Sequence, residues 1–170
     1  VLGSHVEQAG AYYDDKRLRF DFTHFAALTK DELKKVEEMV NQEIAKGELV
    51  KTEEMSLEDA KKSGAIALFG EKYGDKVRVV SVGDYSVELC GGTHVSQSGS
   101  IQGFKIVSEQ GIAAGVRRIE ALTSQNLFDY FQKEEELLKE LSAKLKADPE
   151  HLLQRIESLE QELKSSKSDL

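Results

Sequence analysis

The stretch that decides the fold is residues 77–90, VRVVSVGDYSVELC, in which two short segments rich in β-branched residues flank a glycine. Segments of this kind, separated by glycines, are typical of strands joined by tight turns. The pattern returns at residues 103–108 (GFKIVS) and 116–122 (VRRIEAL). Together they predict a small, largely antiparallel sheet.

A strand and a capped helix are expected upstream of these segments. Residues 17–22, RLRFDF, alternate apolar and charged side chains, which predicts a half-buried strand. Thr29 and Glu32 have the spacing of a capping box, and Gly47 can end the helix that follows. Three shorter features are expected next: a strand near residues 48–55, a short helix from Ser56 to about Gly64, and a turn at residues 70–74.

The N-terminal residues have the spacing of a helix entered midway. Leu2, His5, Val6 and Ala9 share one helical face, and there is no initiator methionine. The tripeptide at residues 3–5 also resembles a purification scar, but the helical phase runs through it. We therefore interpret the start as native sequence from the interior of a longer protein.

The last third of the chain predicts a pair of helices. Residues 124–170 contain no glycine, and Leu127, Phe131, Leu138 and Leu141 form an apolar stripe until Pro149 starts a new segment. This arm holds 11 acidic and 7 basic side chains, which indicates a solvated, coiled-coil-like extension. The predicted class is therefore α+β, with one domain at residues 1–123, its sheet flanked by helices, and a helical arm at residues 124–170.

Composition excludes several classes of function. The formal net charge of −8 over 170 residues lacks the basic footprint of a self-sufficient nucleic-acid binder, so no DNA partner is expected, and any RNA contact must be local or supplied by other parts of a longer protein. The single cysteine cannot close an intramolecular disulfide, and no apolar run is long enough for a membrane span or a secretory signal. We expect a cytoplasmic protein.

The most informative chemical motif is residues 84–94, DYSVELCGGTH, because it carries Cys90 and His94 on either side of a glycine pair. Thiolate and imidazole are good zinc ligands, and glycines let the backbone turn so that both can face one ion. A zinc site needs three or four protein ligands, so the motif is half a site. The alternative is a small buried cysteine and a hydrogen-bonding loop histidine.

Other polar residues have plain structural interpretations. His24 fits a cap or surface residue better than a ligand, and His151 lies in the acidic arm. Gln8 fits an exposed helix residue. Arg117 and Arg118 are adjacent on a strand, so either one is ion-paired and the other solvated, or one contacts a phosphate.

Three ordered blocks resemble the editing region of bacterial-type alanyl-tRNA synthetases, which is also called the second additional domain. They are LGSHVEQAGAYYDDKRLRFDFTHFAALT (residues 2–29), GAIALFGEKYGDKVRVVSVGDYSVELCGGTHVSQSG (64–99) and GFKIVSEQGIAAGVRRIEALT (103–123). The helices that follow resemble the start of that family's C-terminal helical linker. Related editing folds occur in freestanding alanyl-tRNA deacylases and in threonyl-tRNA synthetases.

The resemblance implies a zinc-dependent deacylase that hydrolyses seryl- or glycyl-tRNA wrongly made on the tRNA for alanine. It implies that Cys90 and His94 are metal ligands, that Gln8 is a catalytic residue in the editing pocket, and that four residues contact the substrate: Gly91, Gly92, Thr93 and Arg117. ATP and magnesium would serve the family's separate activation domain. Editing is needed because a pocket sized for alanine cannot exclude glycine and rejects an added hydroxyl only weakly.

One departure from the family pattern concerns the metal. The family's other two zinc ligands lie in a His-x-x-x-His motif that belongs upstream of Val1, so we expect this chain alone to hold zinc poorly and to be weak or inactive. Two alternatives remain: a tRNA-binding or self-association module acting through residues 124–170, and a freestanding deacylase, which the abrupt N-terminus disfavours.

Overall fold

The computed structural model describes residues 1–67 and 72–168, and its contacts divide the chain into two units, Val1–Leu127 and Phe128–Leu170. The expected turn at residues 70–74 has its first two residues outside the described ranges. Each unit is described by itself below.

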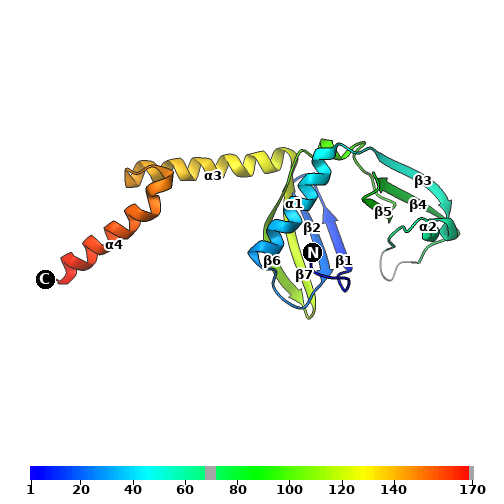
Figure 1. Ribbon diagram of the computed structural model, residues 1–170, viewed down its shortest axis with the longest axis horizontal. Coiled ribbons are helices and arrows are strands. Elements are labelled where there is room, and N and C mark those ends of the chain that lie inside the picture. The colour runs from blue at the N-terminus through cyan, green and yellow to red at the C-terminus, as the bar shows by residue number, and fades with distance from the viewer. Residues whose placement is uncertain (68–71, 169–170) are drawn as a thin grey trace. The chain divides into compact units, whose positions relative to one another are not determined.

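The larger part of the first unit is a four-stranded antiparallel sheet with one helix on one face (Figure 1). The strand order is β1-β2-β7-β6, and all neighbouring strands are antiparallel. The elements are β1 (Gln8–Tyr13), β2 (Leu18–Thr23), β6 (Phe104–Ala113), β7 (Val116–Thr123) and the helix α1 (Lys30–Lys46). Two tight hairpins, β1-β2 and β6-β7, therefore join through the central pair β2-β7.

Helix α1 begins and ends as its sequence predicts. The Thr29 hydroxyl accepts a hydrogen bond from the Glu32 amide at 3.2 Å, while the Glu32 carboxylate accepts one from the Thr29 amide at 2.8 Å. Gly47 ends the helix at φ 64°, a left-handed conformation that glycine adopts without a Cβ clash. The apolar face of α1 can then pack on the sheet, because its ends leave few backbone groups unsatisfied.

The core of this sheet lies between its inner face and α1. Its buried residues are Phe22, Ile106, Ile119 and Ala121, and Leu33 and Val36 of α1 pack against them. Phe22 comes from β2 and Ile119 from β7, so the alternation seen in RLRFDF does deliver one apolar face.

A second antiparallel sheet has the order β3-β4-β5 and forms its own small core. Its strands are β3 (Val50–Ser56), β4 (Lys76–Val82) and β5 (Ser86–Leu89), and the short helix α2 (Leu57–Lys62) follows β3. The buried residues are Ala60, Val77, Val79 and Leu89. Val77 and Val79 alternate with Lys76 and Arg78, which places the two cations on the opposite face of β4.

A buried serine connects the end of α1 to the 3-10 helix η1 (Ser98–Ile101). The Ser98 hydroxyl donates to the Glu43 carbonyl and accepts from the Glu48 amide, both at 2.9 Å. Both polar functions of this 4% exposed side chain are satisfied. The loop that leaves the second sheet is thereby fixed to the helix that covers the first.

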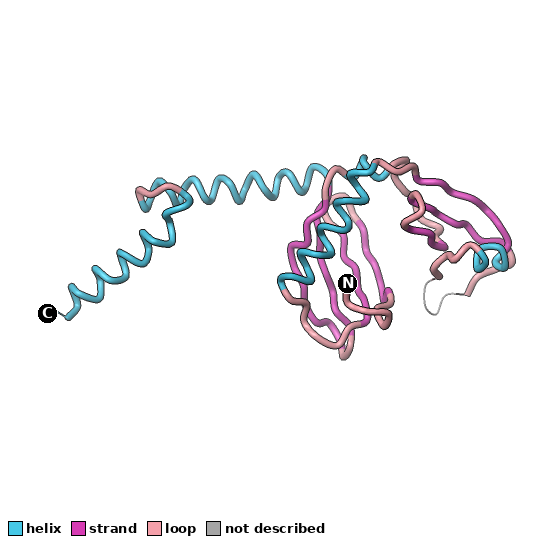
Figure 2. Tube along the Cα trace, viewed as in Figure 1, coloured by secondary structure: helices cyan, strands magenta, loops and turns pink. Residues whose placement is uncertain are grey.

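The remaining elements are helical (Figure 2). They are α3 (Ser124–Leu145), the 3-10 helix η2 (Pro149–His151) and α4 (Leu152–Ser168). Pro149 stands at the first position of η2, where its missing amide costs nothing. Among the described residues, no helix has the length and apolar character that crossing a membrane requires.

The predicted α+β class is confirmed, with the difference that the strands form two sheets. The predicted N-terminal helix is wrong. Residues 1–7 contain only a turn, Gly3 has φ 128°, and Gln8 already pairs with Phe22 in β1. Nine residues with helical spacing are too few to outweigh the edge pairing offered by β2.

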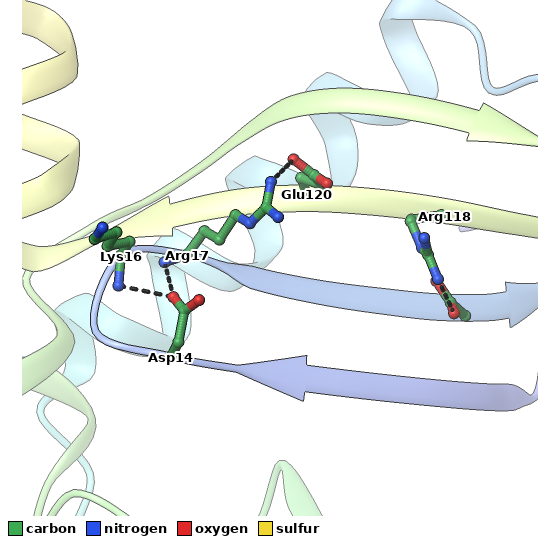
Figure 3. Close-up of polar contacts among 6 residues, drawn as sticks. Asp14, Lys16, Arg17, Arg118 and Glu120 are labelled. Atoms are coloured by element: carbon green, nitrogen blue, oxygen red, sulfur yellow. Dashed lines mark hydrogen bonds and ion pairs between the residues drawn. The ribbon is translucent and has the colours of Figure 1, made fainter.

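Ion pairs cover the outer face of the four-stranded sheet (Figure 3). The Arg118 guanidinium donates two hydrogen bonds to the Asp21 carboxylate, at 2.7 and 3.0 Å, across the β2-β7 pair. Arg17 pairs with Glu120 at 3.0 Å. Asp14 accepts from the amides of Lys16 and Arg17 in the β1-β2 turn, and these bonds lower the pKa of its carboxyl group.

Replacing Asp21 by Asn should make the free energy of unfolding less dependent on pH in the acid range. The bond from Arg118 holds the pKa of Asp21 below its ordinary value. A lowered folded-state pKa stabilises the fold above the unfolded-state pKa of about 3.9, and this contribution is lost as pH falls through the lower folded-state value. Urea unfolding of both proteins between pH 7 and pH 2.5 should show that Asp21→Asn loses less unfolding free energy on acidification than the unaltered chain. Equal losses would contradict this, and Asp15→Asn is the exposed control.

Candidate functional site

The Cys90 turn, residues 90–94, leaves the end of β5 directly. Cys90 follows Leu89, so its side chain faces away from the small core and is half-buried. Its amide donates to the Arg78 carbonyl at 3.1 Å and continues the β4-β5 pairing by one residue. Gly91, Gly92, Thr93 and His94 are all exposed.

Arg78 holds this turn from the neighbouring strand, a role that no sequence pattern indicated. Its Nη1 donates to the Cys90 carbonyl at 3.2 Å and to the Gly92 carbonyl. The Gly92 carbonyl also lies 3.1 Å from Nδ1 of His94, so it accepts a bond there when that nitrogen is protonated. The guanidinium therefore fixes the backbone on both sides of Gly91. Alternation along β4 indicated only that Arg78 is polar and faces away from the core.

The donor set of the turn fits zinc in type but is incomplete in number. A thiol and an imidazole four residues apart are suitable ligands. Within residues 1–67 and 72–168, no group of three or more His, Cys, Asp or Glu side chains is placed to hold a metal ion. Cys90 and His94 can therefore be at most part of a site to which further residues contribute.

The structure puts Gln8 and Arg117 elsewhere, in one row of the four-stranded sheet. Gln8 pairs with Phe22, and Phe22 pairs with Arg117 on its other side. Directly opposed residues of antiparallel strands face the same side, so Gln8 and Arg117 flank Phe22 on the inner face. Among the described residues, no hydrogen bond or ion pair joins either of them to the Cys90 turn.

Gln8 lies at the start of β1 and is half-buried, so the interpretation as an exposed helix residue is wrong. A β-bulge follows it, because the pairing skips a residue between Gln8 and Gly10. Its carboxamide makes no hydrogen bond to the described part of the chain. It is therefore free to donate to and accept from a ligand.

Both arginines of β7 are ion-paired, which corrects the expectation of one paired and one solvated. Nε of Arg117 donates to Glu109 at 2.5 Å, and Arg118 binds Asp21. The bond to Glu109 raises the pKa of Arg117 above its ordinary value. Because the partners lie on other strands or across a hairpin, sequence adjacency alone could not identify them.

His24 is buried at 7% exposure, so of the two expected roles, a cap or a surface residue, the surface role is wrong. Nδ1 of His24 lies 2.7 Å from Nε2 of His5, and the two rings stack with centroids 5.0 Å apart. The hydroxyl of neighbouring Thr23 donates to the His5 carbonyl and accepts from the Glu7 amide, both at 2.9 Å. These contacts hold residues 5–7, and hence the start of β1 at Gln8, against the end of β2.

Comparison with known protein families gives one match. Residues 77–120 match the model described as the threonyl and alanyl tRNA synthetase second additional domain. The matched segment includes most of β4, then β5, the Cys90 turn and β6, and it reaches into β7. It therefore contains Arg78 and both candidate metal ligands.

Individual relatives match along nearly the whole chain. Alanine-tRNA ligase 1 of Lachnoclostridium phytofermentans is 64% identical over 169 residues, which is 99% of this chain. The alanine-tRNA ligases of Acetivibrio thermocellus and a Thermoanaerobacter species are 53% and 52% identical over 170 residues. The chain spans 19% of the length of each of these proteins.

Proposed function

Since the chain aligns almost end to end with one segment of alanine-tRNA ligases, we propose that it is the part of such a ligase that hydrolyses mischarged tRNA. The proposed substrate is the tRNA for alanine carrying serine or glycine. The observation that carries the proposal is the match of residues 77–120 to the second additional domain, which includes the Cys90 turn. Attachment of alanine with ATP and magnesium would belong to other parts of the ligase, and we place the protein in the cytoplasm.

The proposed reaction is hydrolysis of an ester. Water adds its oxygen to the ester carbonyl, the bond to the ribose oxygen breaks, and the ribose hydroxyl leaves with a proton. The products are the free amino acid and an intact tRNA. To favour seryl over alanyl esters, such a site needs a polar group that hydrogen-bonds to the added serine hydroxyl.

Gln8 is suited to that discrimination. Its free carboxamide can both donate to and accept from a serine hydroxyl or the attacking water. The contacts of Thr23 and His24 with residues 5–7 keep the start of β1 in place. In this proposal Arg117, paired with Glu109, lies in the same row and contacts the RNA or the substrate from the inner face.

Cys90 and His94 are proposed to supply two zinc ligands, with Gly91, Gly92 and Thr93 forming the wall of backbone next to the substrate. The remaining ligands would come from a His-x-x-x-His motif elsewhere in the longer protein. Zinc in such a site would polarise the ester carbonyl or a water. Arg78 holds the turn in the shape that presents both side chains.

The test compares the full-length ligase with the 170-residue chain. Each is assayed for bound zinc and for release of serine from seryl-tRNA, with alanyl-tRNA as the matched substrate. We expect zinc and serine release in the full-length protein, and at least about tenfold less of both in the chain, because two ligands hold the ion weakly. No serine release by the full-length protein would refute the function.

A second candidate function is self-association or tRNA binding through α3 and α4. Large apolar side chains of these helices are exposed, including Leu138, Leu141, Ile156 and Leu163. Helices with an exposed apolar stripe bury it by pairing. Light scattering over a range of concentrations tests the idea, since a strict monomer leaves self-association without support.

A further inference from the structure

A pocket of about 450 Å³ lies beside the Cys90 turn, where β4 begins. Cys90, Gly91 and Leu89 form one wall, and Lys72, Lys76 and Arg78 are the charged residues that line it. Among the described residues that line the pocket, none carries a carboxylate.

This composition runs against that of the whole chain. The chain has 31 acidic and 23 basic residues, so a pocket with three cations and no acid among its described lining residues is a local reversal of sign. The carboxylate opposite in the sheet is Glu54, which faces Arg78 across the β3-β4 pair. No ion pair joins the two among the described residues.

The three cations of the pocket differ in whether their side chains already have hydrogen-bond partners. Arg78 already donates to the carbonyls of Cys90 and Gly92. Lys72 and Lys76 are exposed and have no ion pair with any carboxylate in residues 1–67 and 72–168. Within that part of the chain, two ammonium groups therefore remain free to bind an anion in a pocket that is also lined by the first two residues of the Cys90 turn.

We infer that this pocket binds a backbone phosphate of the single-stranded 3′ end of an RNA. The inference rests on the proposed function, in which the ester at that end lies at the Cys90 turn, so phosphates must pass close by. Lysine ammonium groups bind phosphate as point charges. A chain of net charge −8 needs such a local site to hold RNA at all.

The test uses the 170-residue chain and a fluorescent RNA hairpin with a four-nucleotide single-stranded 3′ end. The double variant Lys72→Gln/Lys76→Gln should weaken binding about three- to tenfold. The slope of log Kd against log salt should fall by about 0.7 for each phosphate that the variant no longer neutralises. The control variant Lys51→Gln/Lys61→Gln removes the same charge from exposed positions of β3 and α2 and should change both quantities little. Thermal unfolding checks that all variants are folded.

Four results would overturn the inference, and three of them concern the tailed hairpin: equal weakening by both double variants, unchanged binding by Lys72→Gln/Lys76→Gln, or no binding by the unaltered chain. A blunt hairpin that binds as well as the tailed one would also overturn it. Serine release by the full-length ligase is measured separately. RNA binding that depends on the two lysines, without serine release, would support the phosphate pocket and refute the proposed function. Serine release without such RNA binding would support the proposed function and refute the phosphate pocket.

Discussion

Replacing Cys90 or His94 by Ala in the full-length ligase is expected to reduce serine release from seryl-tRNA by at least about a hundredfold. Removal of residues that merely orient metal ligands typically reduces affinity or activity about 10- to 100-fold, and removal of a ligand should have no smaller effect. The same variants should lose bound zinc. Attachment of alanine to tRNA should be unchanged, because the proposal assigns that reaction to other parts of the protein.

Thr93→Ala is the matched control within the same exposed turn. It lies between the two proposed ligands but has no ligand role, so zinc content should stay close to that of the unaltered enzyme. Normal serine release by Cys90→Ala would remove the metal role and leave the cysteine as a small half-buried residue. Zinc loss with full activity would separate the metal from the reaction.

Replacing Phe22 by Ala should destabilise the 170-residue chain by about 3–5 kcal/mol, as large-to-small changes of buried aromatics do. Phe22 is 4% exposed and packs with Ile106, Ile119 and Ala121 under α1. Domains of this size are stable by only about 5–15 kcal/mol, so much of the margin would be lost. Urea unfolding followed by circular dichroism gives the free energy of unfolding.

Phe25→Ala is the control for this change, because Phe25 is 81% exposed and its ring contacts only the edge of the domain, at the rings of His5 and buried His24. Its removal should destabilise the chain by less than about 1 kcal/mol. Similar destabilisation by the two substitutions would mean that the inner face of the sheet is not the main core.

Local signals in the sequence predicted most of the elements. The capping box of Thr29 and Glu32, the Gly47 end of α1 and the alternation in RLRFDF all act within a few residues, and the structure bears them out. The prediction of an N-terminal helix was wrong because this segment pairs with β2, and strand pairing is a long-range interaction. Residues 1–9 contain no trace of it, and their helical spacing was a coincidence over a short window.

The candidate site shows the same division. The Cys-Gly-Gly-Thr-His motif could be found because its candidate ligands are close in sequence. The partners of His24, Arg117 and Arg118 could not be found in this way, since they depend on which segments the fold brings together. Arg78 was missed for a further reason: it binds main-chain carbonyls, which every residue has and no sequence pattern marks.

Because Arg78 donates hydrogen bonds to two carbonyls of the Cys90 turn, the conformation of this turn depends partly on a residue outside it. A guanidinium that binds main-chain carbonyls does not depend on which residue types occupy positions 91 and 93. Arg78 lies 12 residues before Cys90. A five-residue motif moved to another scaffold would contain the two proposed ligands but not the arginine that holds their backbone in place. The smallest transplantable piece is the whole β4-β5 hairpin with its turn.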